Sequence, residues 1–464
     1  MRTNRVLRRA AAALAAVTLL ATGCAGSDSG DDEETADGAT EVEEAAGDTA
    51  TEDAAPDADG TEDAPAETGA EEPAAADDSS TADLSGETVT LAVLAALTGP
   101  TATVFGEPSE AGARAAIDYL ESEGLAAGGV SYELEVRDSA EDPATVVSQA
   151  RELTNDESLV AILSPSTSES ALAMQPVLNE AGVLGFTTAA TPELWDNACA
   201  DCEYPWMFHA YEYGQVTVRP HLEWLVAQAD PGTTVALAYP LSGYGESQAE
   251  ATEAAAEEMG VDLVSMSFQP GAPDLSAQLR QLRQDAGDTD LLLTWAAYGD
   301  AVQLVNGLRQ IDWTPHVAGP LGMVEAPVLE ALGEENLDRL AAGVVPNTML
   351  VDAEGDEPEG LAVEFWTRFA EETGAAQAGT ASFVGAAAFD MVLVVNAAIE
   401  QAGSTDPAAI REVLDAGLTV DASRGAYEYS ADDRLGQEDA ADFGMMAAQY
   451  SCETGACVAV GTGG

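Results

Sequence analysis

From Thr88 onward, short apolar runs alternate with stretches long enough for amphipathic helices. Helices are expected at 109–122, 144–154 and 168–180, and after each later run. The runs themselves predict buried strands at 88–97, 132–138, 159–165, 183–188, 233–240, 261–268, 289–297 and 316–320. Short apolar strands separated by helices indicate parallel sheets with helices on both faces. The predicted fold class is therefore α/β, and the number of strands favours two doubly wound lobes.

In such sheets, ligands bind beyond the carboxyl ends of the strands. The segments in those places are rich in Gly, Ser, Thr and Tyr and poor in groups for acid–base chemistry; they are 97–108, 164–170, 187–194, 239–247 and 296–300. This composition predicts a site that holds a ligand without transforming it.

Enzymatic motifs are missing from the sequence. It has three histidines and no G-x-S-x-G, H-E-x-x-H or phosphate-binding loop. We therefore expect no catalysis, no cofactor and no metal site.

The stretch TTAATPEL (187–194) ends an apolar run in small residues and hydroxyls just before a helix start. Capping of helix starts by Ser168 or Thr191 is one explanation. The other is an anion site, because free N–H groups and the positive end of the helix dipole attract negative charge. The residues of this stretch leave both readings open.

The N-terminus reads as an export signal. Four arginines, an apolar run at 10–20 and small residues before a cysteine describe a secretory signal peptide at 1–23. The Cys after Ala21, Thr22 and Gly23 resembles the lipobox of bacterial lipoproteins, which implies lipidation of Cys24. Residues 24–87 carry acidic side chains and no basic ones, so they predict a disordered tether.

The whole chain is strongly acidic, with 83 Asp and Glu against 16 basic residues, all of them Arg. The formal net charge of −67 argues against binding of nucleic acid or of anionic membrane surfaces. The acidity also resembles that of salt-adapted proteins, and a GC-rich genome would favour the same composition.

From Thr88 to the end, the chain resembles the type I periplasmic binding proteins of the leucine/isoleucine/valine-binding group. The resemblance rests on the order of several motifs: LTGP…FG (97–106), the run from Arg137 to Leu184, TTAATPEL, YGESQAEATEAAAEEMG (244–260), AAAFDMVLVVNAAIEQAGS (386–404) and SRGAYEYSADDRLGQEDAADFGMMA (423–447). It implies two lobes joined by a three-crossing hinge, one formed by 88–211 with 346–428 and the other by 212–345 with 429–464.

The same resemblance implies a function. Such proteins capture a small solute between two closing lobes and deliver it to the permease of an ABC importer. The expected protein is a monomer, anchored to the outer face of the cell membrane through Cys24. A sensory receptor of the same fold remains the alternative.

The resemblance also implies site residues. The AAT loop, here with Ala189 and Thr191, would hold a ligand carboxylate together with Ser168 or Ser170. Aromatic side chains would close on the rest of the ligand, and the matching positions are Phe105, Tyr244 and Tyr298.

One position departs from the family pattern. Where amino-acid binders place a Glu after a Gly-Pro pair, to meet the ligand's ammonium, this chain has Leu321. Either another carboxylate, among Asp300, Glu325 and Glu107, has taken over, or the ligand lacks an amino group. Aromatic or aliphatic carboxylates, or amides such as urea, are then alternatives to amino acids.

The remaining four cysteines form two local pairs. We expect disulfides between Cys199 and Cys202 and between Cys452 and Cys457, given the extracytoplasmic setting. A redox pair would need a thioredoxin-like context, and a zinc site would have only His209 nearby.

Overall fold

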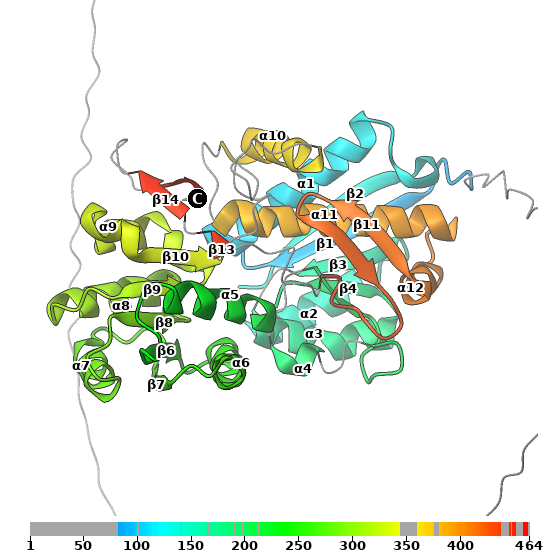
Figure 1. Ribbon diagram of the computed structural model, residues 1–464. Coiled ribbons are helices and arrows are strands. Elements are labelled where there is room, and N and C mark those ends of the chain that lie inside the picture. Colours follow the sequence, from blue (N-terminus) through cyan, green and yellow to red (C-terminus); the bar gives the residue numbers. More distant parts are fainter. Residues whose placement is uncertain are drawn as a thin grey trace, which may run out of the picture. The chain divides into compact units, whose positions relative to one another are not determined.

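Two sheets form the framework of the protein in the computed structural model (Figure 1). All described residues lie in the compact unit Ala76–Gly464. They are 82–99, 102–140, 142–164, 167–189, 191–195, 199–210, 214–343, 360–374, 380–437, 445–446, 448–451 and 458–462. The expected signal peptide, Cys24 and most of the expected tether lie outside them.

The first sheet is parallel throughout, with strand order β2-β1-β3-β4-β5. Its strands are β1 (Thr88–Ala95), β2 (Ser131–Asp138), β3 (Leu159–Ser164), β4 (Leu184–Thr187) and β5 (Met207–His209). The linking helices are η1 (Ala102–Gly106), α1 (Glu107–Ser122), η2 (Ala127–Gly129), α2 (Pro143–Leu153), α3 (Ser168–Ala181) and α4 (Pro192–Trp195). Seven of the eight residues of β1 are buried, as a strand covered on both faces requires.

The second sheet has the order β13-β10-β9-β8-β6-β7 and is parallel except for β13. Its strands are β6 (Val235–Pro240), β7 (Leu263–Phe268), β8 (Leu291–Thr294), β9 (His316–Gly319), β10 (Leu340–Gly343) and β13 (Met445–Met446). Its helices are α5 (Gly214–Val226), α6 (Gly243–Met259), α7 (Ser276–Asp285), α8 (Tyr298–Gln310), η3 (Leu321–Val324), α9 (Ala326–Leu332) and η4 (Glu334–Arg339). The predicted α/β class with two parallel-sheet lobes is confirmed.

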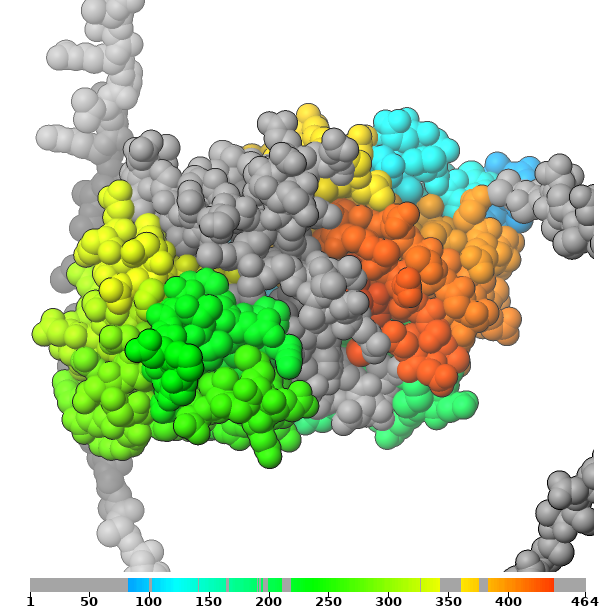
Figure 2. Space-filling model, in the orientation of Figure 1, coloured from blue at the N-terminus to red at the C-terminus, as the bar shows by residue number. Residues whose placement is uncertain are grey.

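Later segments of the chain return to the first sheet. The segments are α10 (Leu361–Thr373), α11 (Thr380–Ala402), α12 (Pro407–Ala416) and the antiparallel pair β11 (Leu418–Ala422) and β12 (Gly425–Tyr429). Phe365, Phe389 and Tyr427 share one hydrophobic cluster with β1 and α1. In Figure 2, yellow residues of α10 accordingly lie beside cyan residues of the N-terminal part. The last described elements are β14 (Ala448–Ser451) and β15 (Val458–Thr462), which pair antiparallel.

We call the first sheet with α1–α4, α10–α12 and β11–β12 the first lobe, and the second sheet with α5–α9 the second lobe. Between described elements, the chain passes from lobe to lobe three times: between 210 and 214, between 343 and 360, and between 437 and 445.

Two expected boundaries need correction. The sequence predicts that the second lobe resumes at 429, but Tyr429 ends β12, and Arg434 bonds to the Pro205 carbonyl and Asp415 of the first lobe. It also predicts a tether that reaches 87, but Leu84 is buried in the first lobe's core and donates its N–H to the Gly128 carbonyl at 2.9 Å. The buried Leu84 side chain holds the segment before residue 88 on the first lobe, and the buried Arg434 side chain holds the segment after residue 429 there.

Helix α11 is long and apolar enough to cross a membrane by composition, but 83% of its most apolar stretch is buried inside the protein. It is the central helix of the first lobe's core, packed against α1 and α12.

Candidate functional site

A cavity of about 350 Å³ lies where strand ends of both lobes meet. Its walls are formed after β1, β3 and β4 of the first lobe, after β6, β7, β8 and β9 of the second, and by α11. The lining residues are Phe105, Thr167, Ser168, Glu169, Thr188, Ala189, Pro240, Ser242, Tyr244, Pro270, Trp295, Ala297, Tyr298, Asp300, Pro320, Leu321, Gly322, Phe383 and Val384. Strand order reverses beside β1 and β6, so the cavity occupies the position at which doubly wound sheets bind ligands.

The first lobe contributes the start of α3. Thr167 caps this helix, and its hydroxyl accepts from the Ser170 N–H. The first N–H groups of a helix have no partner within it, so Ser168 and Glu169 present amide groups and the positive helix end at the cavity wall. Thr188 and Ala189 lie beside them, after β4; the Ala189 N–H donates to the Thr187 hydroxyl at 3.0 Å.

Two predicted residues of the first lobe do not reach the cavity wall. Ser170 is buried, and its hydroxyl accepts from the Thr167 hydroxyl at 3.1 Å. Thr191 is also buried, and its hydroxyl bonds to the Glu193 carboxylate. Of the two serines considered, Ser168 is among the described residues that line the cavity and Ser170 is not.

The second lobe contributes two helix starts and a group of rings. Ser242 caps α6 by accepting from the Gly245 N–H at 3.1 Å, and Tyr244 follows in its first turn. The Trp295 indole N–H donates to the Thr252 hydroxyl at 3.0 Å, and its ring meets that of Tyr244 edge-on at 6.4 Å. These contacts hold two aromatic rings in fixed places at the cavity wall.

Tyr298 opens α8 with a left-handed backbone, φ 52°. This conformation is uncommon for a residue other than glycine and costs free energy, and such residues cluster at ligand sites. Burial, with smaller effects from Glu325 and Tyr244, raises the pKa of the Tyr298 hydroxyl, which therefore stays neutral and able to donate a hydrogen bond.

The two lobes touch across the cavity through aromatic rings. The rings of Phe105 and Tyr298 lie 5.9 Å apart at an interplanar angle of 76°. This edge-to-face contact between side chains of different lobes corresponds to a closed arrangement of the cleft.

Carboxylates lie at the wall as well. Asp300 lines the cavity and accepts from the Gly271 N–H at 2.7 Å. Of the other candidates considered for an amino group, Glu325 and Glu107 are not among the lining residues, whereas Glu169 is. Leu321 is among the lining residues, so the side chain at the position where the resemblance implies a Glu is apolar.

Comparison with known proteins fits this geometry. The sequence profile of one family, described as periplasmic binding protein, matches residues 88–449. The chain belongs to this family. A Leu/Ile/Val-binding protein homolog from Brucella melitensis is 28% identical over 359 residues, covering 74% of this chain and 87% of the relative.

Solved structures share the fold. A type 1 periplasmic binding protein from Bordetella pertussis superposes with a TM-score of 0.66 at 19% identity, covering 76% of this chain and 94% of that one. A solute-binding protein of an ABC transporter from R. palustris, in complex with 4-hydroxybenzoate, has a TM-score of 0.61 at 19% identity and covers 75% and 90%.

The sequence analysis did not identify several residues that line the cavity of this periplasmic binding protein. Thr167 and Ser242 lie in the predicted strand-end segments 164–170 and 239–247 and were not singled out there. Trp295 lies inside the run predicted as a strand at 289–297, whereas β8 ends at Thr294. Phe383 and Val384 come from α11, where an apolar helix gives no sign of which residues face a cavity. The Phe383 ring also lies 4.9 Å from the guanidinium of the buried Arg424.

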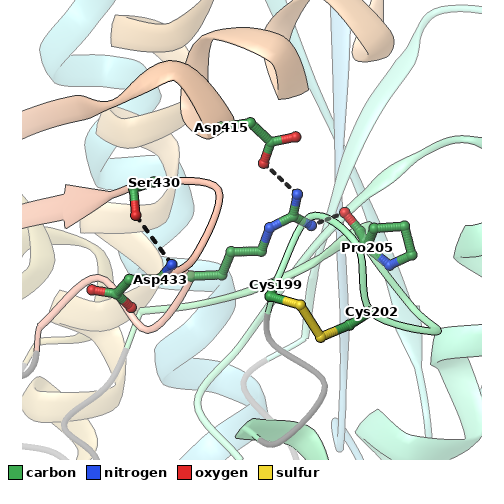
Figure 3. Close-up of a disulfide and its surroundings, with 7 residues drawn as sticks. Cys199, Cys202, Pro205, Asp415, Ser430 and Asp433 are labelled. Carbon is green, nitrogen blue, oxygen red and sulfur yellow. Dashed lines mark hydrogen bonds and ion pairs between the residues drawn. A yellow bond between two sulfur atoms is a disulfide. The ribbon is translucent and has the colours of Figure 1, made fainter. Parts of the chain in front are cut away.

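The Cys199–Cys202 disulfide is present and lies away from the cavity lining (Figure 3). In Figure 3 it lies beside Pro205, whose carbonyl accepts from Arg434; the same guanidinium also contacts Asp415. The loop thus belongs to the packing between β5 and the C-terminal segments. Cys452 and Cys457 lie outside the described residues.

Proposed function

We propose that the protein is an extracytoplasmic solute-binding lipoprotein of an ABC importer. It captures a small amino-acid-like, carboxylate or amide solute between its two lobes and passes it to the permease subunits, whose partner ATPase supplies the energy. The cavity at the meeting of both sheets' strand ends is the observation that carries this proposal.

The chemistry of the cavity supports capture of a small solute. Its wall combines aromatic rings with hydroxyls and helix N-termini, the mixture that orients a small organic molecule by a few polar contacts. In this proposal Ser168, Ala189, Phe105, Tyr244, Tyr298 and Leu321 contact the solute. The relatives' names, for Leu/Ile/Val and for 4-hydroxybenzoate, favour organic acids and amino acids.

Thermal unfolding of the unit Ala76–Gly464 against a solute panel tests the binding function. The panel holds branched-chain and other amino acids, aromatic acids, short-chain acids and amides. A solute at about 100 times its Kd adds about 2.7 kcal/mol of stability and raises the midpoint by several degrees. If protein freed of co-purified solute responds to none of these classes, the proposed function is wrong.

Anchoring and delivery need cellular tests. Labelled fatty acid should enter the wild-type chain and not the Cys24→Ser variant, which should appear in the medium or periplasm. Loss of uptake of the identified solute on deletion of the gene supports transport. Unchanged uptake together with a lost transcriptional response would favour the sensory receptor.

A further inference from the structure

The charged side chains among the described residues that line the cavity are all acidic. Among the described residues that line it, Glu169 and Asp300 are acidic and none is Lys, Arg or His. The positive contributions come from the starts of α3, α6 and α8, which carry partial charges only. A solute with a net negative charge would therefore meet two carboxylates and no full positive charge.

Asp300 already has a structural task. It lies in the first turn of α8, and its Oδ1 accepts from the Gly271 N–H at 2.7 Å. This bond fixes the loop after β7 to the start of α8. Asp300 thus contributes negative charge to the wall, while one of its oxygens is used by the second lobe itself.

Glu169 has no such task. Within the part of the chain that the structure describes, no hydrogen bond or ion pair of its side chain is found. Its Oε1 lies 3.8 Å from the point where a Cβ on Gly243 would stand, so this carboxylate of the first lobe reaches the start of α6 in the second. Glu169 is an exposed residue, and a solute that fills the cavity would displace water from the part of its carboxylate that lines the wall, which is costly without a counter-charge.

We propose that Glu169 binds a cationic group of the solute, and that the solute therefore carries a protonated amine. This inference rests on the proposed function of the cavity. In this arrangement the ammonium of the solute contacts the first residues of α3 in the first lobe. The resemblance to amino-acid binders implies this contact in the second lobe, at the position that Leu321 occupies. An amine held between Glu169 and the start of α6 would also link the lobes in the closed form.

The test compares matched solutes that differ in the amine. One set is leucine, 4-methylpentanoate, which lacks the amine, and 3-methylbutylamine, which lacks the carboxylate; a second is phenylalanine, 3-phenylpropanoate and 2-phenylethylamine. Affinities are measured by calorimetry for wild type, Glu169→Gln and Glu180→Gln. Glu180 lies exposed near the other end of α3, away from the cavity, and is the matched control.

We expect wild type to bind an amine-bearing member at least about tenfold more tightly than its deaminated partner. Glu169→Gln should weaken the amine-bearing solute by about tenfold or more and leave the deaminated partner within about threefold. Glu180→Gln should change neither affinity. All three proteins should melt within about 2 °C of one another, which excludes misfolding.

Other outcomes overturn the inference. An equal loss for both solutes would mean that Glu169 only latches the lobes, and an unchanged affinity would remove it from the site. Tight binding of deaminated acids or of amides by wild type would leave the proposed function standing and refute the amine. Binding of no panel member at all would refute both.

Discussion

Asp390 on α11 and Arg424 form a fully buried ion pair at the heart of the first lobe. Asp390 Oδ1 accepts from the Ser423 N–H at 2.8 Å and from its hydroxyl at 2.6 Å, while Oδ2 accepts from the Tyr427 hydroxyl at 3.0 Å and lies 3.4 Å from Arg424 Nε. We predict that Asp390→Asn destabilises the protein by about 3 kcal/mol, since it leaves the buried guanidinium without its counter-charge.

The magnitude follows from what the introduced amide keeps and what it loses. The side-chain oxygen of the Asp390→Asn variant would still accept from Ser423, so those two bonds survive. The amide NH2 takes the place of Oδ2, so the Tyr427 hydroxyl loses its acceptor and the charge-assisted contact to Arg424 is lost. Removing one partner of a buried pair costs about 3–5 kcal/mol. For the unit Ala76–Gly464, the loss corresponds to a fall of about 4 °C in the unfolding midpoint.

Urea titration, followed by tryptophan fluorescence, measures the difference. Glu110→Gln is the control, because the Glu110–Arg114 pair is 2.8 Å long but its side chains are 34% and 45% exposed, and its loss should cost under about 0.5 kcal/mol. The double variant Asp390→Leu/Arg424→Met should be more stable than Asp390→Asn, since it removes both charges. A cost under about 1 kcal/mol for Asp390→Asn, or a double variant that is less stable still, would refute the reasoning.

Four further predictions concern the cleft, pH, redox state and salt. Phe105→Ala removes the ring contact with Tyr298, so the Kd of the bound solute should rise about two- to tenfold by calorimetry; an unchanged Kd contradicts the contact's role in closure. Burial lowers the pKa of His209 to about 3, so between about pH 6.5 and pH 3 the unfolded chain binds a proton that the folded one does not. Stability should therefore fall with decreasing pH by up to about 1.4 kcal/mol per unit, and His209→Gln should show a shallower loss in urea titrations from about pH 7 to about pH 5; equal slopes contradict this. Cys199→Ser/Cys202→Ser should cost about 2 kcal/mol, the loop-closure value for so short a loop, measured against wild type without reductant; a variant as stable as wild type contradicts it. Raising NaCl from about 0.05 M to about 1 M should raise the melting midpoint, because salt screens the repulsion of a net charge of −67; a lower midpoint contradicts it.

The strands could be read from the sequence because burial on both faces leaves a continuous apolar run. The prediction at 88–97 differs from β1 (Thr88–Ala95) only at its end, and the helix expected at 168–180 differs from α3 (Ser168–Ala181) by one residue. Once the strands are placed, the rule that ligands bind at their carboxyl ends leads to Ser168, Tyr244 and Tyr298.

Long-range contacts set the limit of that reasoning. Leu84 follows an acidic segment whose composition assigns it to the tether, although it packs into the first lobe's core. Sequence reasoning passes over Glu169 because an exposed Glu in the first turn of a helix is expected to interact favourably with the helix dipole alone. Only the approach of α6 from the other lobe shows that this carboxylate faces a cavity.

The buried Asp390–Arg424 pair also connects the cavity wall to two of the places where the chain passes between the lobes. Arg424 donates to the Ala210 carbonyl at 3.0 Å and to Gln437 Oε1 at 3.3 Å, and these are the last described residues before the first and third crossings. Its guanidinium lies over Phe383, which lines the cavity. One buried cation thus contacts the cavity wall and both chain segments that lead to the second lobe. Substitutions there should change solute affinity as well as stability, although no atom of the pair lies in the cavity wall.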